Sequence, residues 1–210
     1  MLDGRTVLVT GGSRGIGEGI VRCLAVEGAE VFFTYASRSE KAKDLVTELG
    51  SERVAAGHME LGERESVFGA WDVAVAWKGH VDVLVNNAAI RTFVDWDAPD
   101  DVFEDRWIET LKANTIAPAH LMRRAVAHWR SRDYPGIVIN ISSRPAYRGD
   151  YPEYLHDGAS KGALSSMTYA VARHFGKNGI SAFVVVPGLI KSDMLDEYFE
   201  THDPGPLLAE

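Results

Sequence analysis

The chain has 210 residues, of which 46% are hydrophobic and 25% are charged, as in a soluble globular protein with a full core. Its formal net charge of −8 argues against nucleic acid or an anionic membrane as the main partner. Its one cysteine, Cys23, cannot form an internal disulfide, and its seven histidines lack metal-ligand spacing. The N-terminus leads directly into a predicted strand, and no apolar run is long enough to span a membrane. We therefore expect a cytoplasmic protein without a metal site.

Short apolar runs rich in β-branched residues alternate with longer amphipathic stretches along the whole chain. Such runs predict strands that are buried on both faces, and the stretches between them predict helices. The predicted strands cover residues 6–10, 30–35, 54–59, 81–87, 136–142 and 180–187, and the predicted helices cover 15–28, 39–50, 63–78, 103–130 and 157–177. This order predicts an α/β fold, with one domain over residues 1–210 and a doubly wound parallel sheet covered by helices on both faces.

The first predicted strand ends in the glycine-rich sequence TGGSRGIG at residues 10–17, and a predicted helix follows at once. Gly11 permits a tight turn, while Gly15 and Gly17 let the phosphates of a ligand approach the backbone. The free N–H groups and the dipole of the following helix favour an anion at this point. The turn therefore predicts a dinucleotide site, against the alternative of a plain glycine-rich connection.

The choice of cofactor is made at the end of the second predicted strand. An acidic residue there binds the ribose of NAD, but this chain has Tyr35-Ala36-Ser37-Arg38 and no acid before Glu40. Ser37 and Arg38 suit a 2′-phosphate, and Arg14 in the glycine turn adds a second cation. We expect NADP(H) to be preferred over NAD(H), although both arginines can also be read as solvated loop residues.

Six short motifs occur in order at the spacing of one known family. They are TGGSRGIG at 10–17, NNAA at 86–89, Asn114, Ser142-Ser143, Ser160-Lys161 and Pro187-Gly188. With them the chain resembles the short-chain dehydrogenase/reductase family over essentially its whole length, and its 3-oxoacyl-reductase-like ketoreductase type in particular.

The resemblance implies a Rossmann-type fold and hydride transfer between a nicotinamide and a small-molecule carbonyl or alcohol substrate. In that family the lysine matching Lys161 holds the nicotinamide ribose and lowers the pKa of a tyrosine, which protonates the carbonyl oxygen. Asn114 is implied to hold a water in the proton relay, and Asn86 to brace the sheet beside the cofactor. The implied catalytic set is Asn114, Ser143, Asp157 and Lys161. The implied cofactor contacts are Gly11, Ser13, Arg14, Gly15, Ile16, Gly17, Ser37, Arg38, Glu60, Leu61, Asn87, Ala88, Lys161, Pro187 and Gly188.

The chain departs from the family at the tyrosine position, which is occupied by Asp157. A carboxyl has an ordinary pKa of about 4, and Lys161 one helical turn later is expected to keep it ionised. The aspartate oxygens also fall roughly 3 Å short of a phenol oxygen. We therefore expect impaired turnover. A second tyrosine, Tyr154, lies seven residues before Lys161, the spacing of the divergent enoyl-reductase branch; otherwise it is a loop tyrosine packed over the mouth of the site.

The substrate-binding serine has two candidates. Ser143 lies fourteen residues before Asp157, one more than the family spacing, and Ser142 is the alternative. The residue at the strict spacing is Arg144, which cannot replace a hydroxyl. His156, which adjoins the predicted helix that carries Lys161, is expected to be an exposed residue near the helix cap.

The resemblance also bears on the end of the chain and on assembly. Family members continue past the sixth strand through a substrate lid to a final edge strand, so the lid after residue 188 is expected to be incomplete and that strand absent. The helices at 103–130 and 157–177 are those that pair subunits in the family, which implies a homodimer or homotetramer. Besides the oxidoreductase, a non-catalytic protein that binds cofactor or acts as an oligomeric scaffold remains an open hypothesis, as does the use of Tyr154.

Overall fold

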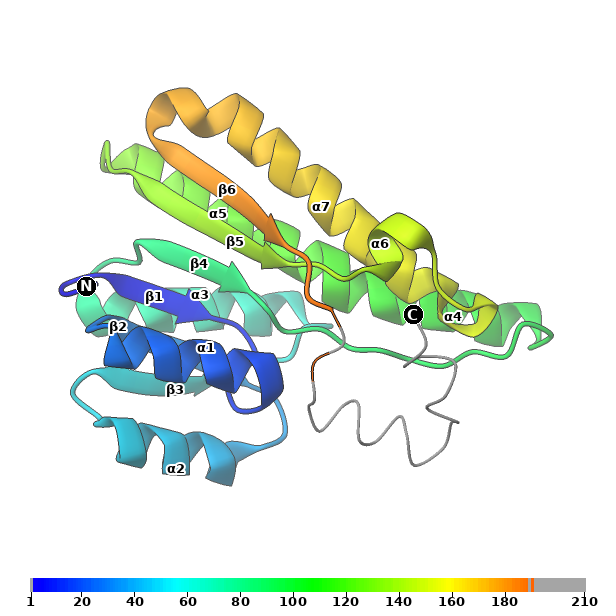
Figure 1. Cartoon of the computed structure of the whole chain (residues 1–210), viewed down its shortest axis with the longest axis horizontal. Coiled ribbons are helices and arrows are strands. Elements are labelled where there is room, and N and C mark those ends of the chain that lie inside the picture. Colours follow the sequence, from blue (N-terminus) through cyan, green and yellow to red (C-terminus); the bar gives the residue numbers. More distant parts are fainter. Residues whose placement is uncertain (1, 189, 191–210) are drawn as a thin grey trace.

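All six predicted strands occur in the structure, a computed structural model that describes residues 2–188 and 190 (Figure 1). The strands are β1 (Thr6–Val9), β2 (Glu30–Tyr35), β3 (Val54–His58), β4 (Val83–Asn86), β5 (Gly136–Ile141) and β6 (Ile180–Val185). The α-helices are α1 (Gly15–Val26), α2 (Ser39–Leu49), α3 (Arg64–Lys78), α4 (Asp100–Leu111), α5 (Ala117–Ser131), α6 (Pro145–Arg148) and α7 (Leu155–Phe175). Three short helical turns are η1 (Lys112–Ile116), η2 (Pro152–Tyr154) and η3 (Gly176–Asn178).

The described strands form one parallel sheet in the order β3-β2-β1-β4-β5-β6. The chain moves outward from β1 to β3, returns to the centre at β4 and then moves outward on the other side. The predicted doubly wound α/β fold is therefore confirmed. The reversal lies between β1 and β4, and their carboxyl ends are where such sheets open a ligand crevice.

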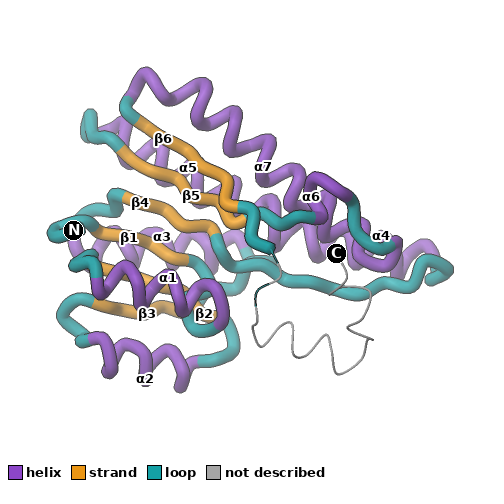
Figure 2. The backbone as a smooth tube through the Cα atoms, viewed as in Figure 1, coloured by secondary structure: helices purple, strands orange, loops and turns teal. Residues whose placement is uncertain are grey.

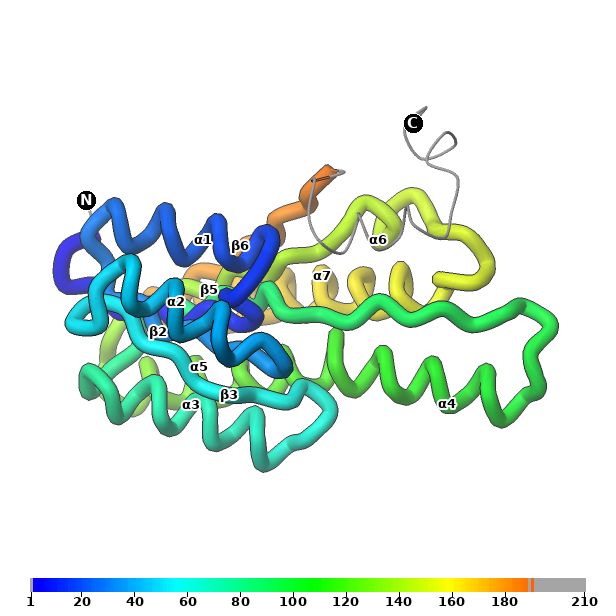
Figure 3. The backbone as a smooth tube through the Cα atoms, turned by 90° about the horizontal axis from the view of Figure 1, so that it is seen from below, coloured from blue at the N-terminus to red at the C-terminus, as the bar shows by residue number. Residues whose placement is uncertain are grey.

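Alternate residues of β1 to β5 fill two cores, one on each face of the sheet, while β6 contributes Ile180 and Ala182 to one of them. Leu8 and Leu84 pack with Trp129 in the core under α3, α5 and α7, while Val7 and Val21 belong to the core under α1 and α2. Figures 1 and 3 show α1 and α3 on opposite sides of the sheet. Burial on both faces explains why the strand sequences are continuously apolar.

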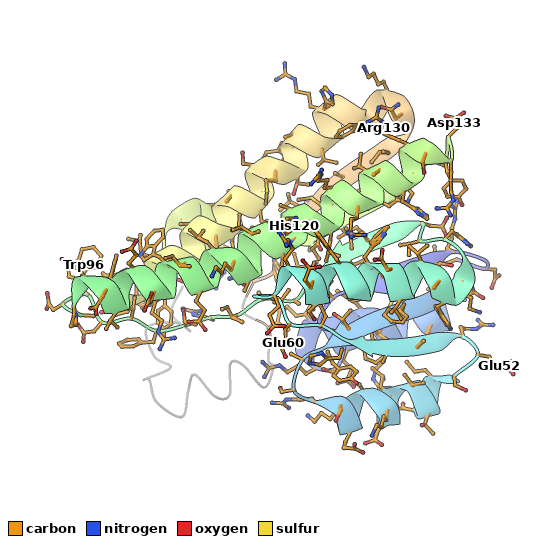
Figure 4. The ribbon with its side chains drawn as sticks, turned by 180° about the vertical axis from the view of Figure 1, so that it is seen from behind. Glu52, Glu60, Trp96, His120, Arg130 and Asp133 are labelled. Carbon is orange, nitrogen blue, oxygen red and sulfur yellow. The ribbon has the colours of Figure 1, made fainter. Side chains whose placement is uncertain are left out.

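The single helix predicted for residues 103–130 consists of three segments. The helical run is α4, then η1, a π-helical turn, and then α5. A π turn inserts one residue into the helical repeat, and such turns are frequent at functional sites. The hydrophobic periodicity continues through the turn, so the sequence pattern did not reveal it. The outer end of α4, near Trp96, extends away from the sheet (Figure 4).

The two ends of the described sheet are β3 and β6. On β6, Phe183 is 54% exposed. The predicted absence of a final edge strand and the incomplete lid after residue 188 concern residues 189 and 191–210, which lie outside the described residues.

Candidate functional site

A cleft of about 970 Å³ opens at the carboxyl ends of the strands. In Figure 2 the loops that leave β1, β4 and β5 gather at this end of the sheet. The cleft is lined by every residue of the predicted catalytic and cofactor sets except Asn114. Residues that are more than 170 positions apart in the chain thus share one cavity, as a crevice at the switch point of the sheet requires.

The glycine turn is held in a conformation that larger residues cannot adopt. Gly11 has a φ of 67° and Gly15 a φ of 53°, both in the left-handed region that favours glycine. A Cβ atom on Gly17 would lie 2.0 Å from the carbonyl oxygen of Gly11 and 2.6 Å from Asn87 Nδ2. The turn at residues 10–17 is therefore close-packed, and only glycine fits at position 17 without displacing its neighbours. We call this turn the cradle.

The NNAA stretch after β4 is hydrogen-bonded to this cradle. Asn87 Nδ2 donates to the carbonyl oxygens of Thr10 and Gly11, at 2.9 and 3.1 Å. Thr10 Oγ1 in turn accepts from the backbone N–H groups of Asn87 and Ala88, at 3.0 and 2.9 Å. These bonds hold β1 and β4 together at the point where the sheet reverses.

The cradle fits the pyrophosphate of a dinucleotide. The helix α1 begins at Gly15, and the N–H groups of its first turn have no partner within a helix. Arg14, Ser37 and Arg38 line the same part of the cleft and offer cationic and hydroxyl groups to phosphate. Glu60 lies at the carboxyl end of β3, opposite the end marked by Glu52 (Figure 4), and also lines the cleft.

Asp157 and Lys161 stand one turn apart on α7, facing the cleft, and both are buried. Lys161 Nζ donates to the carbonyl oxygen of Ile141 at 3.0 Å, while Asp157 Oδ1 accepts from Asn114 Nδ2 at 3.3 Å. Burial lowers the pKa of the Lys161 ammonium, against the opposing charge of Asp157. Burial raises the pKa of the Asp157 carboxyl, against the opposing charges of Lys161 and Arg91.

This direction corrects the expectation drawn from the sequence. We expected Lys161 to favour the charged form of Asp157, and its charge does act in that sense. The desolvation of the carboxyl outweighs it, so the protonated form of Asp157 is favoured relative to an exposed aspartate. Sequence spacing gave the neighbour of Asp157 but not the depth at which both groups are buried.

The two candidate serines have different surroundings. Ser142 is buried, donates to the carbonyl oxygen of Lys161 at 3.1 Å and contacts Ser165 Oγ at 2.9 Å. Both serines line the cleft, but the Ser143 hydroxyl makes no hydrogen bond to another described residue. Ser142 is thus engaged in holding β5 to α7, which favours Ser143 as the serine that faces a substrate.

Asn114 lies behind the cleft, in the π turn η1, and is buried. Its side chain pairs with both backbone groups of Ile90: the Ile90 N–H donates to Oδ1 at 2.9 Å, and Nδ2 donates to the carbonyl oxygen at 2.9 Å. Nδ2 also contacts Ser160 Oγ at 3.2 Å. Asn114 therefore fastens the loop after β4 to α7 beside Asp157.

Two expectations next to the site were wrong. His156 is fully buried rather than exposed, and its Nε2 contacts Thr92 Oγ1 and the Thr92 carbonyl oxygen at 2.9 and 3.0 Å. Tyr154 lies in η2 rather than in a loop, is buried, and does not line the cleft. The segment 144–156 also contains α6, a helix that the sequence did not predict.

Sequence reasoning missed Arg91, which lines the cleft two residues after the NNAA stretch. Its Cζ atom lies 4.1 Å from the centre of the Tyr154 ring, and its Nη2 lies 3.4 Å from Asp150 Oδ2. The signal was an arginine close behind a family motif, in the loop that follows a central strand.

The described residues contain no group of three or more histidine, cysteine, aspartate or glutamate side chains that could hold a metal ion. Within the same residues, no helix has both the length and the apolar character needed to cross a bilayer.

The fold and the cleft together define a dinucleotide-binding α/β protein. The sequence profile of the short chain dehydrogenase family matches residues 5–203, and the chain belongs to this family. Versicolorin reductase stcU of Emericella nidulans is 33% identical over 196 residues, which are 92% of this chain and 72% of that protein. The cyclic-di-GMP-binding biofilm dispersal mediator protein of Escherichia coli (strain K12) is 38% identical over 193 residues, which are 90% of this chain and 75% of that protein.

The chain is also similar to a solved structure of a blue fluorescent protein from a metagenomic library in complex with NADPH. The TM-score is 0.82 at 38% identity, and the match covers 92% of this chain and 77% of that one. The chain therefore has the fold and the scaffold of a nicotinamide-dependent oxidoreductase.

Proposed function

We propose that the chain is an NADP(H)-dependent oxidoreductase that transfers hydride between the nicotinamide and a small carbonyl or alcohol substrate, with turnover limited by Asp157. One observation carries the proposal: a single cleft joins the phosphate cradle of the glycine turn to Ser143, Asp157 and Lys161. Binding groups and a potential proton donor thus face the same cavity.

The side chains have distinct roles in this proposal. The glycine turn, Arg14 and Arg38 bind the phosphates, and the nicotinamide supplies or accepts hydride when bound. Lys161 holds the ribose next to it, and Ser143 donates a hydrogen bond to the substrate oxygen. Asp157 gives that oxygen a proton, because its buried carboxyl has a raised pKa.

The short side chain of Asp157 is the weak point of this arrangement. Its oxygens fall roughly 3 Å short of where a tyrosine hydroxyl would lie. Losing a well-positioned general acid costs about 10²- to 10⁴-fold in rate. We therefore expect slow reduction, with a proton that reaches the substrate through a longer path.

The test is NADPH consumption over a panel of carbonyl compounds, with the wild-type chain, Asp157→Glu and Asp157→Tyr. Turnover should rise with the reach of the side chain, and Asp157→Tyr should gain roughly 10²-fold or more. Tyr154→Phe is the matched control, since the buried Tyr154 ring does not line the cleft and its variant should keep wild-type turnover. Equal turnover by the wild-type chain and Asp157→Tyr would contradict the proposal, and loss of activity in Tyr154→Phe would favour the enoyl-reductase-like alternative.

A second candidate is a nucleotide-binding protein without turnover. The relative that is 38% identical is named for binding cyclic-di-GMP, and the phosphate cradle here has two arginines next to an active site that lacks its tyrosine. In this case cyclic-di-GMP should displace NADPH from the cleft, and Asp157→Tyr should gain no activity. A titration of the NADPH-loaded protein with cyclic-di-GMP distinguishes the two functions.

We also propose a cytoplasmic homodimer or homotetramer. The helical run of α4 and η1 exposes the apolar side chains of Val102, Ile108 and Ile116, which support pairing through this part of the molecule. Sedimentation of the purified chain measures the assembly directly.

A further inference from the structure

Arg91 is a charged residue of the cleft to which the proposed reaction assigns no role. It follows β4 after five residues and lines the cavity together with Asp157 and Lys161. Its partners Asp150 and Tyr154 belong to the segment that leads into α7, the helix that carries Asp157 and Lys161, which puts the guanidinium at this end of the cleft rather than at the phosphate cradle. Any substrate that reaches Asp157 therefore comes close to a positive charge.

An aromatic ring and a carboxylate hold this guanidinium in position. The Tyr154 ring lies under Cζ at 4.1 Å, and the Asp150 carboxylate lies 3.4 Å from Nη2. The Arg91 side chain is 27% exposed, while the Asp150 side chain is 4% exposed. The next residue, Thr92, is tied to the buried His156 and to Thr110 Oγ1, so the backbone below Arg91 is also held. Because these contacts already order the Arg91 side chain, the binding of an anion costs little further conformational entropy.

The other cations of the cleft have different positions. Lys161 Nζ is directed to the Ile141 carbonyl oxygen, and Arg14 and Arg38 belong to the loops at the phosphate end. Lys112 lines the cleft from η1, beside Glu109 from the same helical run. Arg91 thus brings a guanidinium to the end of the cleft that holds Asp157 and Lys161. A guanidinium matches a carboxylate with two parallel hydrogen bonds, which an ester or amide cannot accept with the same strength.

We propose that Arg91 recognises the carboxylate of the substrate, so that the carbonyl compounds bound in this cleft are oxo acids. The inference rests on the proposed function for the reaction, but recognition of the acid is a separate property of the cleft. The alternative is that Arg91 only joins η2 to the loop after β4 through Tyr154 and Asp150.

The experiment compares 4-oxopentanoate with its methyl ester by calorimetric titration, both with saturating NADP⁺ and without cofactor. The acid should bind roughly 10- to 100-fold more tightly than the ester, the range of a charge-assisted pair in a partly buried site. Arg91→Gln should abolish this preference, and Arg91→Lys should keep part of it.

Asp150→Asn is the matched control, because it breaks the same ion pair while leaving the Arg91 charge in place. If Arg91 were only structural, Asp150→Asn and Arg91→Gln would behave alike; under the proposal Asp150→Asn keeps the preference for the acid. Failure of the acid to bind, equal binding of acid and ester, or a preference that survives in Arg91→Gln would overturn the proposal. Failure of NADPH to bind would instead count against the proposed function, and the titrations without cofactor would still decide the role of Arg91.

Discussion

Two glycines on the same helix should respond in opposite ways to one added methyl group. Gly17 is buried in the cradle, where a Cβ atom would lie 2.0 Å from the Gly11 carbonyl oxygen and 2.6 Å from Asn87 Nδ2. Ordinary contacts are about 3.5–4.0 Å, so the backbone of the turn has to move by more than an ångström. Gly19, two residues later on α1, has nothing within 4 Å of the same added atom.

The magnitudes follow from these contacts. Gly17→Ala overpacks a site whose neighbours are held by hydrogen bonds, and should lower the free energy of unfolding by about 1–3 kcal/mol. The displaced turn should weaken NADPH binding by roughly 10- to 100-fold. Gly19→Ala adds a better helix former at an exposed position and should raise the free energy of unfolding by about 0.5–1 kcal/mol, with NADPH binding unchanged.

Urea unfolding and NADPH fluorescence titration measure both quantities on the same samples. The reasoning is refuted if Gly17→Ala binds NADPH like the wild-type chain, because the close packing of the cradle would then not matter for the cofactor. It is also refuted if Gly19→Ala loses as much affinity as Gly17→Ala, because the effect would then belong to the helix and not to the cradle.

Two further predictions concern charge. Arg38→Asp should weaken NADPH binding much more than NADH binding, with the exposed Arg64→Asp as control, and equal losses for the two cofactors in a titration would remove the basis for NADP(H) preference. Asp157→Asn should raise the free energy of unfolding at about pH 7 but not at about pH 4. Because burial raises the pKa of the folded-state carboxyl, the wild-type chain loses stability as the pH rises from the ordinary carboxyl pKa of about 3.9 through the raised folded value. Urea unfolding at both pH values, with the exposed Asp72→Asn as control, measures this, and an equal effect of Asp157→Asn at both values would contradict it.

The sheet could be predicted from the sequence because its strands are buried on both faces. Runs such as EVFFTY at 30–35 place apolar side chains on both faces of a strand, as a parallel sheet between two helical layers requires. The π turn η1 could not be predicted, since the helical pattern of 103–130 passes through it without interruption. Within this turn Asn114 pairs with Ile90, a residue 24 positions away, and such a contact is not visible in a local helical pattern.

The cleft-lining residues were found because each follows a strand or lies on a helix next to one. The sequence did not show how deeply each of these residues is buried. His156 was expected to be exposed, but Thr92 covers it from a loop 64 positions earlier in the chain. Arg91 is held by Asp150 and Tyr154, which come from the segment 144–156, where the sequence predicted neither a helix nor a strand.

The burial of Asp157 also changes what can be expected of it as a proton donor. On the sequence alone, the exchange of tyrosine for aspartate looks like the loss of a proton, because an aspartate beside a lysine is ionised. In the structure the carboxyl and the ammonium are both buried, and burial moves the pKa of each towards its uncharged form. The protonated form of Asp157, which can donate a proton, is therefore favoured more than in an exposed aspartate, and the objection from charge is weaker than the sequence suggested. The aspartate oxygens still lie short of the position of a tyrosine hydroxyl. We therefore expect the length of the side chain at position 157, rather than its charge, to set the rate of reduction.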